Sequence, residues 1–228
     1  MIGVTDEAGV RVVTLDRPER RNALTPDALD RLERAITTAE APILRLRGAG
    51  SAFCAGADLD DVADLDRESA EAFAGRGQRV GNAIEDSESV VVAEIDGAAR
   101  GGGVEIALAC DLRIGTPRAT FAEPGVEFGL FGAWGGTRRL PRILGLGDAL
   151  DLALSGRVLD SEAALRIGLV SRILEEPATV ADELAANDPA ALRTLKERLR
   201  DDAPRTVADR REATAFADLV AAADVGPG

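Results

Sequence analysis

The chain has 228 residues, of which 46% are hydrophobic and 29% are charged, a composition typical of a globular protein with a substantial core. Lys+Arg number 27 against 40 Asp+Glu, so the formal net charge of −13 argues against nucleic acid or an anionic membrane surface as a partner. No apolar run reaches the ~18 residues of a membrane span. Asp6 and Glu7 lie where a secretory signal would be basic. We therefore expect a cytoplasmic protein.

Three residue types narrow the possible chemistry. The sequence contains no histidine, which excludes Ser-His-Asp, Cys-His and histidine-based zinc sites. Cys54 and Cys110 are too few for a disulfide framework. The single lysine is Lys196. An acid–base catalyst in this chain must be a carboxylate, that lysine or a cysteine.

The acidic surplus, combined with a near absence of lysine, predicts a surface adapted to concentrated salt. At ~1 M salt the Debye length is ~3 Å, which screens the repulsion between carboxylates while they keep the protein hydrated. The alternative interpretation is a genomic bias toward arginine, alanine and glycine.

The N-terminal part alternates predicted strands and helices. Thr25 and Pro26 supply an N-cap and an N1 proline for a helix that continues to about Ala39. The near-continuous apolar run 90–95 is typical of a strand buried on both faces of a parallel sheet. Further strands are predicted at 10–15, 43–47, 112–116 and 119–121, with helices ending near 84, over 104–110 and beginning near 137.

The second part of the chain is predicted to be helical from about Gly147, apart from the short apolar segment 168–174. Pro177 and Pro189 mark helix starts. The sequence therefore predicts an α/β core over residues 1–145, followed by a helical C-terminal region over residues 146–228.

Two glycine-rich segments are candidate sites. The first, Gly48–Phe53, continues into 54–59, and the second spans 97–105. Neither has the spacing of a dinucleotide-binding fingerprint or of a phosphate-binding P-loop. The simplest interpretation of each segment is a turn after a strand.

The second glycine-rich segment, 97–105, also predicts a binding position for an oxygen atom. A strand, three glycines (Gly101, Gly102 and Gly103) and an apolar helix leave free backbone N–H groups at the helix N-terminus, with no side chains to block an approaching oxygen. Such a position suits an oxyanion. Glu105 lies on the first helical turn, within reach of a ligand at the glycines, although a carboxylate there is also stabilised by the helix dipole alone.

Segment 92–112 resembles the signature of the enoyl-CoA hydratase/isomerase (crotonase) family. Other motifs of that family follow in order, namely 15–18 with 22–24, 53–59, 121–124, 135–142, 155–157 with 163–164, and 168–170. The resemblance implies a spiral of ββα units followed by a helical trimerisation region. It also implies a homotrimer or dimer of trimers that acts on acyl-CoA thioesters in fatty acid metabolism.

The resemblance also assigns site residues. The backbone N–H groups of Ala57 and Gly102 would hold the thioester oxygen, and Glu105 would be a catalytic carboxylate. The resemblance implies no metal or redox cofactor, because coenzyme A is part of the substrate. The residues implied to bind substrate and CoA are Arg21, Ala23, Leu24, Ala55, Asp58, Leu59, Gly101, Pro124 and Gly125.

The chain departs from the family pattern at the second catalytic acid. Family hydratases carry a second glutamate directly after the Phe-x-x-Pro motif, where this chain has Gly125. The position eight residues further, acidic in some isomerases and hydrolases of the family, is Ala133. Glu123 and Glu127 flank the gap, and we interpret them as surface or structural acids; the alternative is that a bent loop brings one of them inward.

The C-terminal end is a second departure. The family commonly continues into a final helix near the CoA of a neighbouring subunit, whereas this chain stops at Gly228. We therefore expect the helical region to be shortened at its end. Part of the CoA-binding site or of the oligomer contact would then be formed by other residues. Arg100 also stands where the family usually has a small or apolar residue.

The resulting hypothesis is an enoyl-CoA hydratase or isomerase that works through an oxyanion-stabilised enolate with a single catalytic glutamate. Isomerisation is the simpler reaction for one carboxylate, which can move a proton between two carbons. The competing hypothesis is a non-catalytic acyl-CoA-binding protein or a helper subunit of another family member.

Overall fold

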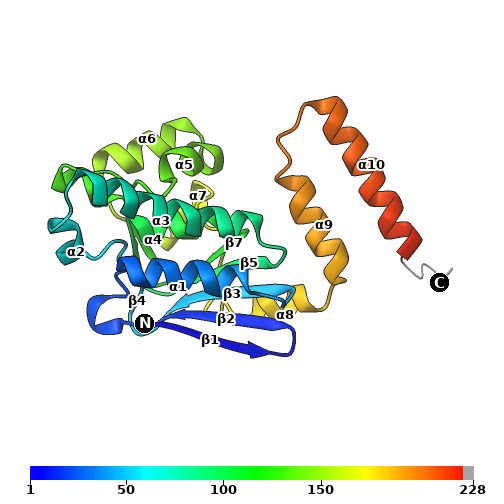
Figure 1. The fold of residues 1–228 in the computed structure, drawn as a ribbon, viewed down its shortest axis with the longest axis horizontal. Coiled ribbons are helices and arrows are strands. Elements are labelled where there is room, and N and C mark those ends of the chain that lie inside the picture. The colour runs from blue at the N-terminus through cyan, green and yellow to red at the C-terminus, as the bar shows by residue number, and fades with distance from the viewer. Residues whose placement is uncertain (223–228) are drawn as a thin grey trace.

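The computed structural model describes residues 1–222 and contains two β-sheets with helices packed around them (Figure 1). The larger sheet has the strand order β1-β2-β3-β5-β7-β10. These strands are β1 (Ile2–Glu7), β2 (Val10–Leu15), β3 (Ile43–Gly48), β5 (Val90–Ile95), β7 (Leu112–Gly115) and β10 (Arg172–Ile173). β1 and β2 form an antiparallel hairpin, and the other neighbours are parallel. The sequence prediction missed β1.

The second sheet joins short strands in the order β4-β6-β8-β9. They are β4 (Ala52–Cys54), β6 (Ala98–Arg100), β8 (Thr120–Ala122) and β9 (Leu159–Asp160). A strand of the large sheet, a short strand of this sheet and a helix therefore follow one another repeatedly along the chain. β9 interrupts the region that the sequence predicted to be helical, because it pairs antiparallel with the distant β8.

Helices α1 (Pro26–Thr37) and α3 (Arg67–Asp86) lie side by side (Figure 1). The Thr25 hydroxyl accepts a hydrogen bond from Ala28 N, as expected for an N-cap. α1 buries Leu29, Leu32 and Ile36 on one stripe. The other helices before residue 170 are the 3₁₀ turns η1 (Pro18–Arg20) and η2 (Pro124–Phe128), and α2 (Leu59–Ala63), α4 (Gly102–Ala109), α5 (Gly136–Leu144), α6 (Leu146–Ser155) and α7 (Ser161–Arg166).

The core lies between the sheets and the helices. Every residue of β5 is buried, as the sequence predicted for a strand covered on both faces. α4 is buried along nearly its whole length, which agrees with its apolar composition. The N-terminus of α4 carries the second glycine-rich segment, so the candidate site is built into the core.

The C-terminal helices α8 (Thr179–Ala185), α9 (Pro189–Leu199) and α10 (Arg205–Ala222) follow, and α9 and α10 stand beside the rest of the molecule (Figure 1). Lys196 anchors α9, because its Nζ pairs with Asp111 at 2.9 Å and donates to the Ser89 carbonyl at 2.7 Å. α10 has no buried residue among those described. The shortened end that the sequence predicts falls on residues outside the described range. The boundary at residue 145/146 between the α/β core and the helical region stays a prediction.

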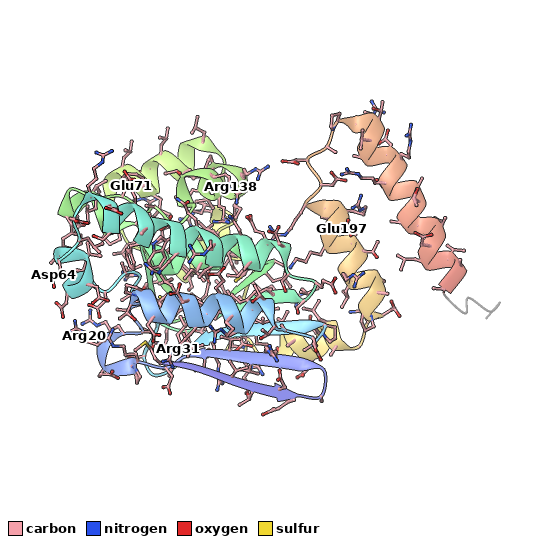
Figure 2. All side chains as sticks on the ribbon, in the orientation of Figure 1. Arg20, Arg31, Asp64, Glu71, Arg138 and Glu197 are labelled. Atoms are coloured by element: carbon pink, nitrogen blue, oxygen red, sulfur yellow. The ribbon has the colours of Figure 1, made fainter. Side chains whose placement is uncertain are left out.

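Charged side chains cover the outer surface of the molecule. Figure 2 labels Arg31, Glu71 and Glu197 on the helices α1, α3 and α9, and all three side chains are exposed. Many arginines pair with acids, as in the ion pairs of Asp30 with Arg76 and Arg79. Within residues 1–222, no helix is both long enough and apolar enough to cross a bilayer.

Candidate active site

The segment after β4 meets the start of α4, and each of the two contributes a backbone N–H group that no backbone acceptor of the described residues takes up. Leu24 forms an isolated parallel bridge with Ala57: Leu24 N donates to Gly56 O at 2.8 Å, and Asp58 N donates to Leu24 O at 3.1 Å. In this pattern the N–H of Ala57 points away from Leu24 and is left over. Gly102 is the first residue of α4, and its N–H has no intrahelical acceptor.

Glycines allow these two segments to approach each other. A Cβ on Gly56 would lie 2.9 Å from Gly102 N and 2.7 Å from Arg100 O, and its φ of +85° also favours glycine. Gly101, which precedes α4, has φ +48° and ψ −119°, a conformation that L-residues rarely adopt. Ala57 and Gly102 therefore lie close together and line one pocket, as two donors to a single oxygen must.

An aromatic pair forms another side of the site. The Trp134 ring lies against the backbone of Gly102 and Gly77, where added Cβ atoms would come within 2.2 Å and 2.1 Å of it. Phe73 meets Trp134 edge-on, with ring centroids 5.6 Å apart. The sequence prediction did not include either aromatic residue, because their meeting depends on the packing of α3 against a distant loop.

Glu105 lies in the interior and is only 1% exposed. Its Oε1 accepts hydrogen bonds from Trp134 N at 2.9 Å and from Gly136 N at 2.6 Å. Gly132 and Gly136 pack directly against the carboxyl, since a Cβ on either would come within 2.7 Å of it. Burial raises the pKa of Glu105 to about 7, against the opposing effect of the two N–H donors. Within the described chain, no group donates to Oε2.

Glu123 is the second acid that faces this region. It directly follows β8, whose Ala122 pairs with Arg100 and accepts from Gly101 N at 3.0 Å, so the strand pairing places Glu123 next to the glycine run. The side chain is 6% exposed, and its Oε1 is buried without a hydrogen-bond partner among the described residues. Glu123 is therefore buried and not at the surface, whereas Glu127 is exposed.

Both acids line a pocket of about 240 Å³. Eight residues that the sequence predicted for the site line it: Ala55, Ala57, Leu59, Gly101, Gly102, Glu105, Pro124 and Gly125. The other lining residues are mostly apolar: Val62, Leu65, Ala70, Phe73, Ala74, Phe128, Leu130, Phe131, Gly132, Ala133 and Trp134, together with Glu123. The pocket can hold an apolar chain, with a polar end at the N–H donors and the two carboxyl groups.

Comparison with known proteins identifies the family. The enoyl-CoA hydratase/isomerase family model matches residues 5–225. The chain belongs to this family. It is 35% identical to a short-chain-enoyl-CoA hydratase of Clostridium acetobutylicum over 84% of this chain and 77% of the relative. It is 37% identical to a crotonyl-CoA hydratase of Syntrophomonas wolfei over 74% of this chain and 67% of the relative.

Solved structures of the enoyl-CoA hydratase/isomerase family share this fold. The crystal structure of enoyl-CoA hydratase from Thermoplasma volcanium superposes with a TM-score of 0.90 at 28% identity, covering 96% of this chain and 92% of that one. The crotonase-like α/β fold implied by the sequence resemblance is thus confirmed.

Four residues that the family resemblance assigned to substrate or CoA binding do not line this pocket. Ala23 and Leu24 are buried beneath the loop that holds Ala57. Asp58 is 3% exposed and pairs with Arg17 at 2.5 Å and with Arg20 at 3.1 Å, and it also accepts from Asp60 N at the start of α2. Arg20 lies at the edge of the molecule in Figure 2. Asp58 therefore holds the loop in place.

Arg21, the fourth of these residues, is exposed outside the pocket, and its carbonyl accepts from Ala55 N at 2.9 Å. Arg100, which is unusual for the family, donates to the Thr120 carbonyl at 2.8 Å and to the Thr120 hydroxyl at 3.1 Å. It therefore joins β6 to β8 next to the glycine run.

The other candidate acid–base groups lie outside the pocket. Cys54 and Cys110 are buried, and burial raises the pKa of both thiols to about 12, so neither is a thiolate at neutral pH. Lys196 is held by Asp111 and two carbonyls under α9. Among the candidates from the sequence, carboxyl groups alone reach the pocket of this family member.

Proposed function

We propose that this family member catalyses proton transfer on an enoyl-CoA thioester through an enolate held by the N–H groups of Ala57 and Gly102. The observation that carries the proposal is the meeting of these two donors with the buried carboxyl of Glu105 around one apolar pocket. Each donor in an oxyanion hole contributes about 3–4 kcal/mol to stabilising the developing charge.

Glu105 is suited to act as the base. With a pKa near 7, the carboxyl is ionised in part of the molecules at neutral pH and is more basic than an exposed glutamate. Trp134 N and Gly136 N hold Oε1, which leaves Oε2 for the substrate. For isomerisation, the carboxylate takes the proton at C2 of a 3-enoyl thioester, and the dienolate is then reprotonated at C4. This route needs no metal or redox cofactor.

Hydration is the second candidate reaction, because the relatives named above are hydratases. Here Glu105 would remove a proton from water as the oxygen bonds to C3 of a 2-enoyl thioester. The carbanion at C2 then needs a proton from another donor. The two reactions therefore differ in how many acid–base groups they require.

The α9–α10 hairpin supports association with further copies of the chain, and the family resemblance makes a homotrimer or dimer of trimers the proposed assembly. Leu195 and Leu199 on α9 and Phe216 and Val220 on α10 are large apolar side chains that the single chain leaves exposed. Covering them against a neighbouring copy would remove this surface from water. Light scattering of the purified protein should give three or six times the mass of one chain.

The function is tested by adding crotonyl-CoA, and separately a 3-enoyl-CoA, to the purified protein in high salt and following the absorbance of the conjugated thioester. Hydration lowers the absorbance of the first substrate, and isomerisation raises that of the second. Glu105→Ala should abolish either activity, and retained turnover in this variant would refute the role of Glu105. A protein that binds CoA thioesters but converts neither would instead be the non-catalytic binder.

A further inference from the structure

A side chain at Gly125, the position of the missing second acid, would be crowded by the backbone of the following loop. A Cβ on this residue would lie 3.0 Å from the Phe131 Cα and 3.1 Å from the Leu130 carbonyl oxygen. Leu130 N also donates to the Gly125 carbonyl at 2.8 Å, which closes the loop over this position. A glutamate at position 125 would therefore require the loop backbone at residues 130–131 to shift.

Glu123, two residues earlier, reaches the same pocket from the end of β8. Glu105 and Glu123 line both the main pocket and a smaller adjoining cavity of about 50 Å³. Glu123 contributes a buried oxygen without a partner in the part of the chain that the structure describes. A buried carboxyl without donors is costly to keep unless it serves a ligand or retains its proton.

We propose that Glu123 is the second catalytic acid of this enzyme and delivers a proton to C2 of a 2-enoyl thioester during hydration. This inference rests on the proposed function, and it replaces the single-glutamate mechanism that the sequence predicts. An inward-facing Glu123 is the alternative that the sequence leaves open, because the family pattern places the second acid directly after Pro124.

The two carboxyl groups have the protonation states that such a reaction needs. Burial, reinforced by the charge of Glu105, raises the pKa of Glu123 well above its ordinary value. This shift favours the protonated form of Glu123, which can donate a proton, whereas the two N–H groups that Glu105 accepts favour the ionised form of Glu105. Paired carboxyls whose environments separate their pKa values in this way are suited to opposite roles.

Hydration can then be written with balanced protons and electrons. The Glu105 carboxylate takes a proton from water while the water oxygen bonds to C3, and the C2–C3 π pair moves into the enolate held by Ala57 and Gly102. The enolate re-forms the thioester carbonyl as C2 takes the proton of Glu123. The product is a 3-hydroxyacyl thioester, and the proton on Glu105 returns to Glu123 to reset the pair.

The test compares Glu123→Gln with the matched control Glu127→Gln, which changes the same group on an exposed residue. The readouts are hydration of crotonyl-CoA, isomerisation of a 3-enoyl-CoA and binding of the CoA thioester. Loss of a general acid costs roughly 10²–10⁴-fold. We expect Glu123→Gln to lower kcat for hydration by at least about 10²-fold with binding retained, and Glu127→Gln to behave as wild type. Added acetic acid should partly restore hydration in Glu123→Ala.

The outcomes separate this inference from the proposed function. Hydration by Glu123→Gln at the rate of the Glu127→Gln control would overturn the role of Glu123, while an inactive Glu105→Gln would leave the proposed function standing. Glu123→Gln could instead lose both thioester binding and hydration, with no rescue of Glu123→Ala by acetic acid. That result would assign the residue a structural role and overturn the inference. A wild-type protein that converts neither thioester overturns both.

Discussion

Replacing Glu105 by glutamine should make the protein more stable at high pH, although it removes the proposed base. Burial raises the pKa of Glu105 from the ordinary 4.5 to about 7, so ionising this carboxyl in the folded state costs about 3 kcal/mol at about 1.4 kcal/mol per pKa unit. Glutamine cannot ionise, and its carbonyl oxygen can still accept from Trp134 N and Gly136 N. The fold around the site is therefore retained.

Proton binding explains why the stability of the variant relative to wild type increases with pH. Between about pH 4.5 and about pH 7 the folded wild type keeps the Glu105 proton and the unfolded chain releases it, so the wild type loses stability as the pH rises. The loss is complete above about pH 7, and below about pH 4.5 both states are protonated. The variant has no ionisable group at position 105, so it does not lose stability in this way. Its free energy of unfolding relative to wild type should therefore increase by about 2.5 kcal/mol between about pH 5 and about pH 8.

Urea unfolding of the two proteins at both pH values and constant ionic strength measures this difference. Glu127→Gln serves as the control, because its exposed side chain should give the same difference from wild type at both values. If the stabilities of Glu105→Gln and wild type changed in parallel with pH, Glu105 would not carry a raised pKa. The argument that it is a base poised near neutral pH would then be refuted.

Two further predictions concern the glycine run and the surface. Gly102→Ala places a Cβ 2.2 Å from the Trp134 ring, so it should lower the free energy of unfolding by about 1–3 kcal/mol and reduce kcat/KM. Gly75→Ala, which meets nothing within 4 Å, should be neutral or slightly stabilising in the same measurements. With a net charge of −13, the protein should also resist urea better in molar salt than in low salt, because screening removes repulsion between carboxylates. Equal stability across that range would contradict a salt-adapted surface.

Local sequence patterns determined much of the fold and the centre of the site. Thr25 and Pro26 identified the start of α1, and the apolar run 90–95 identified a strand buried on both faces. The glycine run indicated free N–H groups at the start of α4, with Glu105 on the first turn of the same helix. These features depend on contacts within one turn or on the side-chain period of a single element, so they can be found without the rest of the chain.

Tertiary packing decided the properties that make these groups chemically useful. Glu105 is buried because α4 lies inside the core, and its two N–H donors come from residues about thirty positions later in the chain. The pairing of β8 with β6 turns Glu123 inward, although in sequence it reads as one more acid on an acidic surface. The pKa of a carboxyl depends on the neighbours that replace water around it, and those neighbours are distant in the sequence. The sequence alone determined which residue types could do the chemistry and singled out Glu105, and only the packed structure brought Glu123 to the same pocket.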